Sequence, residues 1–229
     1  MNNLIDLTDV LPRHRGKPPA IRKKIKRIVL HTTDWEVTPE ELAAYDIGPN
    51  HISNTGCPTI TYSYLVGLDG KIFKTARHEW VTWHVGNWNT GSLGVALVYK
   101  TNPEYEKAKV KGKPTPPLEE GASPSGLMND SMIRLLVELC IHETVTPSNI
   151  YGHRELKGTG WFNQNGSRRL RKTCPGMAIN LDRLRSRVTL ALQHRLKDLG
   201  VYDGAIDGKF GSKSKGALAE AKCHSQLPT

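Results

Sequence analysis

Short apolar runs in the first hundred residues predict a buried β-sheet. Runs rich in Val, Ile, Leu and Tyr occupy residues 26–31, 59–66, 71–75 and 93–99. Runs of this length and composition are typical of strands. The second and third flank Gly67-Leu68-Asp69-Gly70, a turn sequence that predicts a β-hairpin. The first run ends at His31, so this side chain is expected at the carboxyl end of a buried strand, where α/β folds place their chemistry.

Capping signals and amphipathic spacing predict helices around the strands. Thr38, Pro39 and Glu41 form the start signal of a helix that ends before Gly48, with Thr38 as N-cap and Glu41 completing a capping box. Residues 130–143 predict a second helix, because their apolar residues recur on one face. These apolar residues are Met132, Leu135, Leu136, Leu139 and Cys140. Strands that alternate with helices predict an α/β fold.

Two segments stand apart from this pattern. Residues 101–126 are rich in Lys, Pro and Gly, so we expect an exposed, mobile insertion there. A further helix is predicted to begin near Asn180, and residues 183–187 form the expected join to a second unit. In that unit an apolar stripe over residues 188–199 ends at Gly200, and a short helix carries residues 217–221. The sequence therefore predicts a small all-α C-terminal domain, whose core alone is marginal.

Net charge narrows the choice of partners. The chain of 229 residues has a formal charge of +10, which predicts attraction to a polyanion such as nucleic acid, an anionic membrane or a cell-wall polymer. Basic residues gather in segments 17–27, 107–113 and 168–187. Few aromatic residues are interleaved with them, so stacking of single-stranded bases is not indicated. No nucleic-acid partner is expected.

The N-terminal residues and the cysteines indicate the cellular compartment in which the protein is expected. The first seven residues include Asp6 and lack the basic start and apolar run of a signal peptide, and no stretch approaches the ~20 apolar residues of a membrane span. We therefore expect a cytoplasmic protein in the producing host. In that reducing compartment the four cysteines are expected to be free thiols or metal ligands rather than disulfides.

Three residues suggest a metal site. His31 ends a strand, His153 lies in Tyr151-Gly152-His153-Arg154, and Cys174 precedes Pro175-Gly176. Two imidazoles and one thiolate suit Zn²⁺, and three protein ligands leave a fourth position for water or substrate. Such a site polarises a carbonyl and acidifies a bound water, which is the chemistry of amide hydrolysis. Spacing alone does not single these residues out, because any of the nine histidines is more often a surface or hydrogen-bonded residue than a ligand.

An ordered set of motifs strengthens this interpretation. In sequence order these are Ile28-Val29-Leu30-His31-Thr32-Thr33, Tyr62-Ser63-Tyr64-Leu65, Trp83-His84-Val85-Gly86, Ser92-Leu93-Gly94-Val95, Gly152-His153-Arg154 and Lys172-Thr173-Cys174-Pro175-Gly176. Over residues 25–180 the chain resembles the type 2 N-acetylmuramoyl-L-alanine amidases, which include phage endolysins and are similar to peptidoglycan-recognition proteins. The resemblance implies a central mixed β-sheet flanked by helices and one catalytic Zn²⁺ held by His31, His153 and Cys174.

The same resemblance implies roles for three further residues. Tyr62 and Lys172 are expected to be catalytic: Lys172 stabilises the oxyanion of the tetrahedral intermediate, and Tyr62 orients the water or shares that stabilisation. Which of the two moves the proton is open. His84 matches a position near the substrate groove and is expected to contact substrate. A purely structural or ligand-supporting His84 is an equal alternative.

The sequence departs from the family pattern at two places. Relatives often carry Glu where this chain has Ala96, so the arrangement with Tyr62 fits better. Residues 158–169 form an inserted loop, in which Trp161 and Phe162 either line the substrate groove or anchor the loop. His51 and Cys57 form another His/Cys pair, but they lack the flanking Lys and Gly of the Cys174 motif and are interpreted as a decoy. Cys140 is interpreted as core packing.

The C-terminal unit has a resemblance of its own. Leu192-Gln193-His194-Arg195-Leu196, Tyr202-Asp203-Gly204 and Ile206-Asp207-Gly208-Lys209-Phe210-Gly211 are similar to the small helical peptidoglycan-binding domain found in cell-wall hydrolases. A calcium-loop reading of the Asp residues fails, because the later acidic ligands are absent. The predicted domains are therefore residues 1–180, catalytic, and residues 188–229, peptidoglycan-binding.

Both resemblances imply one substrate, bacterial peptidoglycan. The expected activity is hydrolysis of the amide between N-acetylmuramic acid and L-alanine, by a monomeric phage endolysin that reaches the wall after membrane permeabilisation. An anionic cell-envelope surface is a possible further partner, given the positive charge. The alternatives are a non-catalytic peptidoglycan-recognition protein and a bacterial autolysin.

Overall fold

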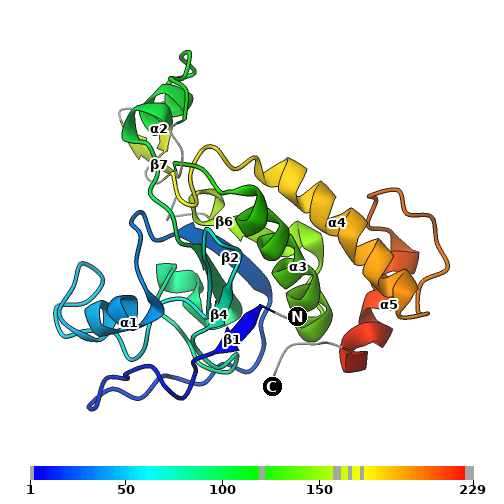
Figure 1. Ribbon diagram of the computed structural model, residues 1–229, viewed down its shortest axis with the longest axis horizontal. Helices are drawn as coiled ribbons and strands as arrows, with labels where there is room; N and C mark the ends of the chain where they lie inside the picture. Colours follow the sequence, from blue (N-terminus) through cyan, green and yellow to red (C-terminus); the bar gives the residue numbers. More distant parts are fainter. Residues whose placement is uncertain (1–2, 119–121, 157–160, 165–166, 171–172, 225–229) are drawn as a thin grey trace.

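A computed structural model describes residues 3–118, 122–156, 161–164, 167–170 and 173–224. Its centre is a six-stranded sheet in the order β1-β4-β3-β5-β2-β6 (Figure 1). The strands are β1 (Leu4–Asp6), β2 (Arg27–Thr32), β3 (Tyr64–Val66), β4 (Ile72–Lys74), β5 (Ser92–Leu97) and β6 (Ile150–Gly152). Strand β2 is parallel to β5 and β6, whereas β3 and β4 pair antiparallel. The predicted mixed sheet and the hairpin are confirmed, although β3 is shorter than the predicted run.

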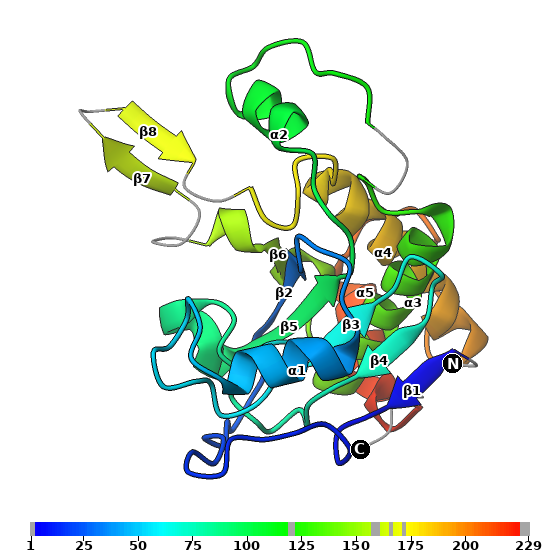
Figure 2. The same ribbon diagram turned by 60° about the vertical axis from the view of Figure 1, so that its left-hand side comes forward.

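Helices cover both faces of the sheet. Helix α1 (Pro39–Ile47) packs Leu42 and Ala43 against one face, together with Leu65 and Ala96. Helices α3 (Gly126–Glu143) and α4 (Leu181–Asp198) cover the other face (Figure 2). Their buried side chains share one core cluster with Ile28, Leu30 and Tyr64 of the sheet. The capping box at α1 is confirmed: Thr38 Oγ1 accepts from the Glu41 amide at 3.2 Å, and a Glu41 carboxylate oxygen accepts from the Thr38 amide at 2.9 Å.

The segment predicted as an exposed, mobile insertion contains a helix. Helix α2 (Pro103–Val110) lies within it, and α3 begins earlier than predicted, with Ser125 as N-cap. Glu106 of α2 is buried and accepts hydrogen bonds from the Met177 amide at 2.8 and 3.0 Å. The prediction that residues 101–126 are exposed is therefore wrong at Glu106. Within the segment predicted as an inserted loop, strands β7 (Trp161–Gln164) and β8 (Ser167–Leu170) pair antiparallel. The side chains of Trp161 and Phe162 lie outside the described part, so their predicted roles stay predictions.

The C-terminal region is helical, as predicted. Helix α4 is followed by α5 (Ser212–Glu220) and the 3-10 turn η4 (Ala221–His224). However, α4 runs without a break through the predicted join at residues 183–187, and Val188, Leu192 and Leu196 belong to the same hydrophobic core as α3. The two predicted units thus share a helix, and their division into separate domains stays a prediction.

Among the described residues, no helix combines the length and apolar character needed to cross a membrane.

Candidate metal centre

Strand geometry positions His31. Successive side chains of β2 point to opposite faces, so Leu30 enters the core under α3 and His31 points the other way. His31 is 1% exposed and pairs across the sheet with Ala96 of β5. A residue at position 96 would therefore adjoin His31. Relatives are expected to carry Glu at this position. Because Ala96 has no carboxylate, this chain has no acidic side chain there beside His31.

The three predicted ligands converge. Ligand atoms of His31, His153 and Cys174 all lie within 4.8 Å of one another. Cys174 Sγ is 3.6 Å from His31 Nδ1. A tetrahedral Zn²⁺ with bonds of about 2.3 Å to sulfur and about 2.0 Å to nitrogen separates those two atoms by about 3.5 Å. The donor set and its spacing therefore fit zinc.

Arg154 holds the segment that carries Cys174. Its Nη1 donates to the carbonyls of Thr173 at 3.0 Å and Gly176 at 2.8 Å, and its Nη2 donates to the carbonyl of Ile179 at 2.7 Å. The Arg154 amide also donates to the Cys174 carbonyl at 3.0 Å. Burial lowers the pKa of this guanidinium, which remains charged. Arg154, next to the predicted ligand His153, therefore fixes the segment that carries the predicted ligand Cys174, and no sequence motif indicated this role.

Gly152 permits the close approach of the two ligand segments. A Cβ at this position would lie 2.7 Å from the Leu181 side chain and 2.9 Å from Pro175. Pro175 follows Cys174, and Leu181 begins α4. Glycine before His153 is therefore required for packing, independently of any chemistry.

His84 lies beside His31 and is buried rather than exposed to solvent. It is 7% exposed, and its Nδ1 is 2.9 Å from His31 Nε2. Its own Nε2 lies 3.4 Å from the Ser92 carbonyl, which can only accept. Gly94 makes room for the ring, since a Cβ there would lie 3.0 Å from it. The predicted substrate contact stays a prediction, but the described hydrogen bonds match the ligand-supporting alternative.

These contacts define the protonation of both rings. Burial, with the charge of Arg22, lowers the pKa of His84 to about 3, so the ring is neutral. The Ser92 carbonyl requires a proton on His84 Nε2, which leaves His84 Nδ1 as the acceptor from His31 Nε2–H. The lone pair of His31 Nδ1 then faces Cys174, as a metal ligand requires.

Tyr62 lies beside the cluster. Its ring centroid is 4.9 Å from that of His31. Burial, together with the charge of Cys174, raises the pKa of the Tyr62 phenol. It therefore stays protonated and is available as a hydrogen-bond donor. Lys172, the other predicted catalytic residue, lies outside the described residues, and both catalytic roles stay predictions.

The alternative ligand pair is separate from this centre. His51 is exposed and its Nδ1 is 3.0 Å from the Tyr45 hydroxyl, while Cys57 is buried. Within the described ranges neither belongs to a group of three potential ligands. Cys140, a residue of α3, is fully buried in the core, as expected.

A second histidine cluster lies on the opposite side of the sheet. His78 and His142 each place Nδ1 near one Glu143 oxygen, at 2.5 and 2.7 Å, and the Tyr64 hydroxyl is 2.7 Å from His78 Nε2. Ligands of a tetrahedral zinc would stand about 3.3 Å apart. The shorter distances indicate a hydrogen-bonded cluster. Although burial alone would raise the pKa of Glu143, hydrogen bonds from His142 and His78 lower it to about 2.

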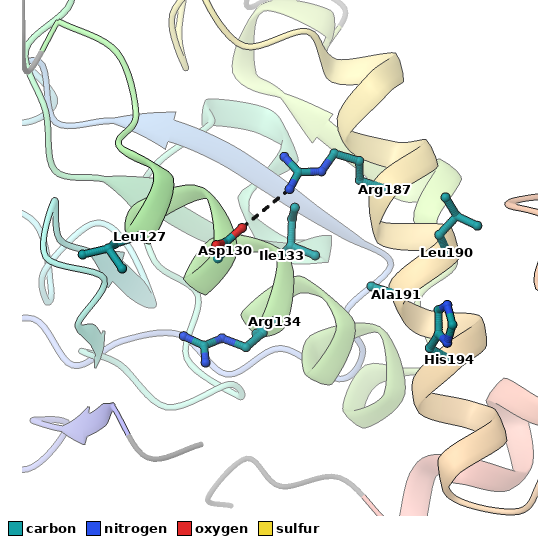
Figure 3. A pocket seen from close by; sticks show the side chains of 8 residues that line it. All are labelled: Leu127, Asp130, Ile133, Arg134, Arg187, Leu190, Ala191 and His194. Carbon is teal, nitrogen blue, oxygen red and sulfur yellow. Dashed lines mark ion pairs between the residues drawn. The ribbon is translucent and has the colours of Figure 1, made fainter.

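A groove of about 600 Å³ lies between α3 and α4 (Figure 3). Leu127, Ile133 and Leu190 contribute its apolar side chains, and Asp130 pairs with Arg187 across it at 3.6 Å. It belongs to the helical layer on the face opposite His31. We assign it no part in the chemistry.

Comparison with known proteins agrees with this geometry. Residues 21–177 match the family described as N-acetylmuramoyl-L-alanine amidase. Peptidoglycan-recognition protein SC2 of Drosophila melanogaster is 25% identical over 111 residues, which are 48% of this chain and 50% of that protein. The chain thus spans about half the length of the curated relatives it matches.

Solved structures share the fold. N-acetylmuramoyl-L-alanine amidase LysC from Clostridium intestinale URNW superposes with a TM-score of 0.57 at 16% identity, over 81% of this chain and 96% of that one. The Ph2119 endolysin of a Thermus scotoductus bacteriophage gives 0.51 at 20% identity, over 81% and 98%. Peptidoglycan recognition protein LE, in complex with tracheal cytotoxin, gives 0.53 at 18% identity, over 78% and 91%. With the family match covering more than half of its residues, the chain belongs to the N-acetylmuramoyl-L-alanine amidase family.

Proposed function

We propose that this protein is a zinc-dependent amidase that hydrolyses the bond between N-acetylmuramic acid and L-alanine in peptidoglycan. The convergence of His31, His153 and Cys174, at a spacing that fits tetrahedral zinc, carries the proposal. Bound zinc would supply a Lewis acid that acidifies water and polarises the scissile carbonyl. The family match to residues 21–177 supports the reaction class.

The protein's own residues would divide the remaining work. His84 keeps the His31 lone pair directed at the metal position. The protonated Tyr62 phenol would donate a hydrogen bond to the oxygen on which charge develops, and Lys172 would stabilise the same charge. Arg154 keeps Cys174 in register with His153.

We further propose that the protein acts as a phage endolysin, made in the host cytoplasm and reaching the wall once the membrane is permeable. The endolysin of similar fold supports this origin. Residues 188–229 would hold the enzyme on peptidoglycan, as their resemblance to wall-binding domains suggests. A bacterial autolysin is the alternative origin, and a holin gene beside the coding sequence would favour the phage.

The decisive experiment is hydrolysis of purified cell wall by the zinc-loaded protein. We expect new L-alanine amino termini, and we expect His31→Ala to abolish them together with zinc binding. The relatives named as recognition proteins make a non-catalytic binder the second candidate. Full zinc occupancy and wall binding without new amino termini would establish that candidate instead.

A further inference from the structure

A cationic groove lies at the opposite end of β2 from the metal centre. Its volume is about 440 Å³, and its walls come from the segment before β2 and from η1 (Gly86–Gly91). The lining includes Lys23, Lys24, Lys26, Arg27 and Trp88. The three lysines are exposed to solvent. The groove is thus an accessible surface that concentrates positive charge.

Acidic side chains do not neutralise this charge. Over the described ranges, none of the four cations forms an ion pair, and no Asp or Glu lines the groove. Arg27 instead stacks on Trp88, with its guanidinium carbon 4.6 Å from the ring centroid. Like charges gathered in a groove repel one another and attract anions from solution. This combination suits a ligand with several negative charges.

The groove and the metal centre share one face of β2. Arg27, Val29 and His31 point to the same side because side chains alternate along a strand. Four residues of strand separate Arg27 from His31 by about 13 Å. A polymer bound in the groove would therefore lie on the same face of the protein as the peptidoglycan strand that enters the metal centre.

Phosphate is the anion that this lining fits. Lysines act as mobile point charges toward phosphate, and an arginine guanidinium can bind two phosphate oxygens at once. Nucleic acid fits less well, because Arg27 already covers the Trp88 ring that would stack a base. A membrane fits less well because Ile21, 65% exposed, is the only large exposed apolar side chain of the lining.

We propose that this groove binds the phosphodiester groups of an anionic cell-wall polymer and so holds the enzyme beside its substrate. The choice of a wall polymer rests on the proposed function, whereas the affinity for phosphodiesters rests on the groove itself. The interaction is electrostatic, so it weakens as salt rises.

The test compares two triple variants that lower the net charge equally. One, Lys23→Gln/Lys24→Gln/Lys26→Gln, removes the groove lysines; the other, Lys109→Gln/Lys111→Gln/Lys113→Gln, removes exposed lysines near α2. Binding of soluble poly(glycerol phosphate) is measured by calorimetry over a salt series, with thermal unfolding as the folding control.

We expect the groove variant to lose about tenfold or more in affinity and the α2 variant to stay close to the parent protein. The slope of log affinity against log salt should become shallower by about 2–3 in the groove variant only, since each neutralised phosphate contributes about 0.7–0.9. Equal losses in both variants, or no binding by the parent protein, would overturn the proposal. Tighter groove-dependent binding of duplex DNA or anionic vesicles would overturn the choice of polymer.

Hydrolysis is scored separately on a small soluble muropeptide. Both triple variants should retain parental turnover there, because none of the six lysines belongs to the metal centre. A parent protein that binds the polymer but fails to hydrolyse any muropeptide would contradict the proposed function and leave the groove proposal standing.

Discussion

Replacing His84 by alanine tests whether this residue supports the predicted metal ligand His31. The substitution removes the acceptor that lies 2.9 Å from His31 Nε2. His31 would then be free to turn its ring or to carry its proton on Nδ1, the atom that faces Cys174. Either change competes with metal binding, so the first measurable effect should be on zinc affinity.

The size of the effect follows from the burial of this contact. His31 is 1% exposed and His84 is 7% exposed, so water cannot easily replace the lost acceptor. An unsatisfied buried donor costs about 1–3 kcal/mol. Loss of a residue that orients a metal-binding His reduces affinity about 10–100-fold, which corresponds to about 1.4–2.7 kcal/mol. The two figures agree, and we expect zinc to bind His84→Ala 10–100-fold more weakly.

Competition with a chromophoric chelator measures this affinity directly. His84→Asn should recover most of it, because the amide Oδ1 lies where the ring Nδ1 was and accepts from His31. His51→Ala is the matched control, since His51 is exposed and lies outside the metal centre. Zinc affinity unchanged in His84→Ala, with a raised KM for muropeptide, would refute the supporting role and favour the predicted substrate contact.

Further predictions concern the other residues of the two clusters. Cys174→Ser should lose zinc and amidase activity together, whereas Lys172→Ala should keep zinc, measured by metal analysis, and lose at least about a hundredfold in turnover; loss of zinc in the second variant would mean that Lys172 has a structural role. Arg154→Met should lower the free energy of unfolding in urea by about 2–4 kcal/mol, because three partly buried carbonyls lose a charged donor; an unchanged urea midpoint would contradict the anchoring role. Glu143, whose pKa falls to about 2, should contribute stability above its ordinary pKa of 4.5 that disappears as pH falls from there toward 2. Urea titrations at several pH values should show this loss in the parent protein and a flatter dependence in Glu143→Gln.

Features set by neighbouring residues were predictable from the sequence. The capping box of α1 involves Thr38 and Glu41, three positions apart, and the strand before His31 is a contiguous apolar run. Both therefore appeared where expected. The three predicted ligands could not be chosen by spacing alone. The ordered motifs of the family singled them out, and the structure brings their ligand atoms within 4.8 Å of one another.

Features set by distant contacts were not predictable. Helix α2 has no apolar face, and its buried residue is Glu106, which is held by the amide of Met177 far along the chain. The anchoring by Arg154 depends on backbone carbonyls that carry no side-chain signal. The contact between His84 and His31 joins residues 53 positions apart. Only the folded sheet brings these groups together.

The unbroken course of α4 bears on how the proposed enzyme would move over peptidoglycan. With 18 residues the helix is about 27 Å long, and it runs without a break from Leu181, shortly after the Cys174 segment, to Asp198 in the C-terminal unit. If the C-terminal unit binds the wall, the rigid helix α4 would fix the distance between the binding point and the proposed hydrolytic centre. The centre would then reach only bonds at that distance from each binding point. Such an enzyme would have to dissociate from the wall before it could hydrolyse bonds elsewhere. Its rate on intact wall would therefore depend on the dissociation rate of the C-terminal unit as well as on the rate of hydrolysis.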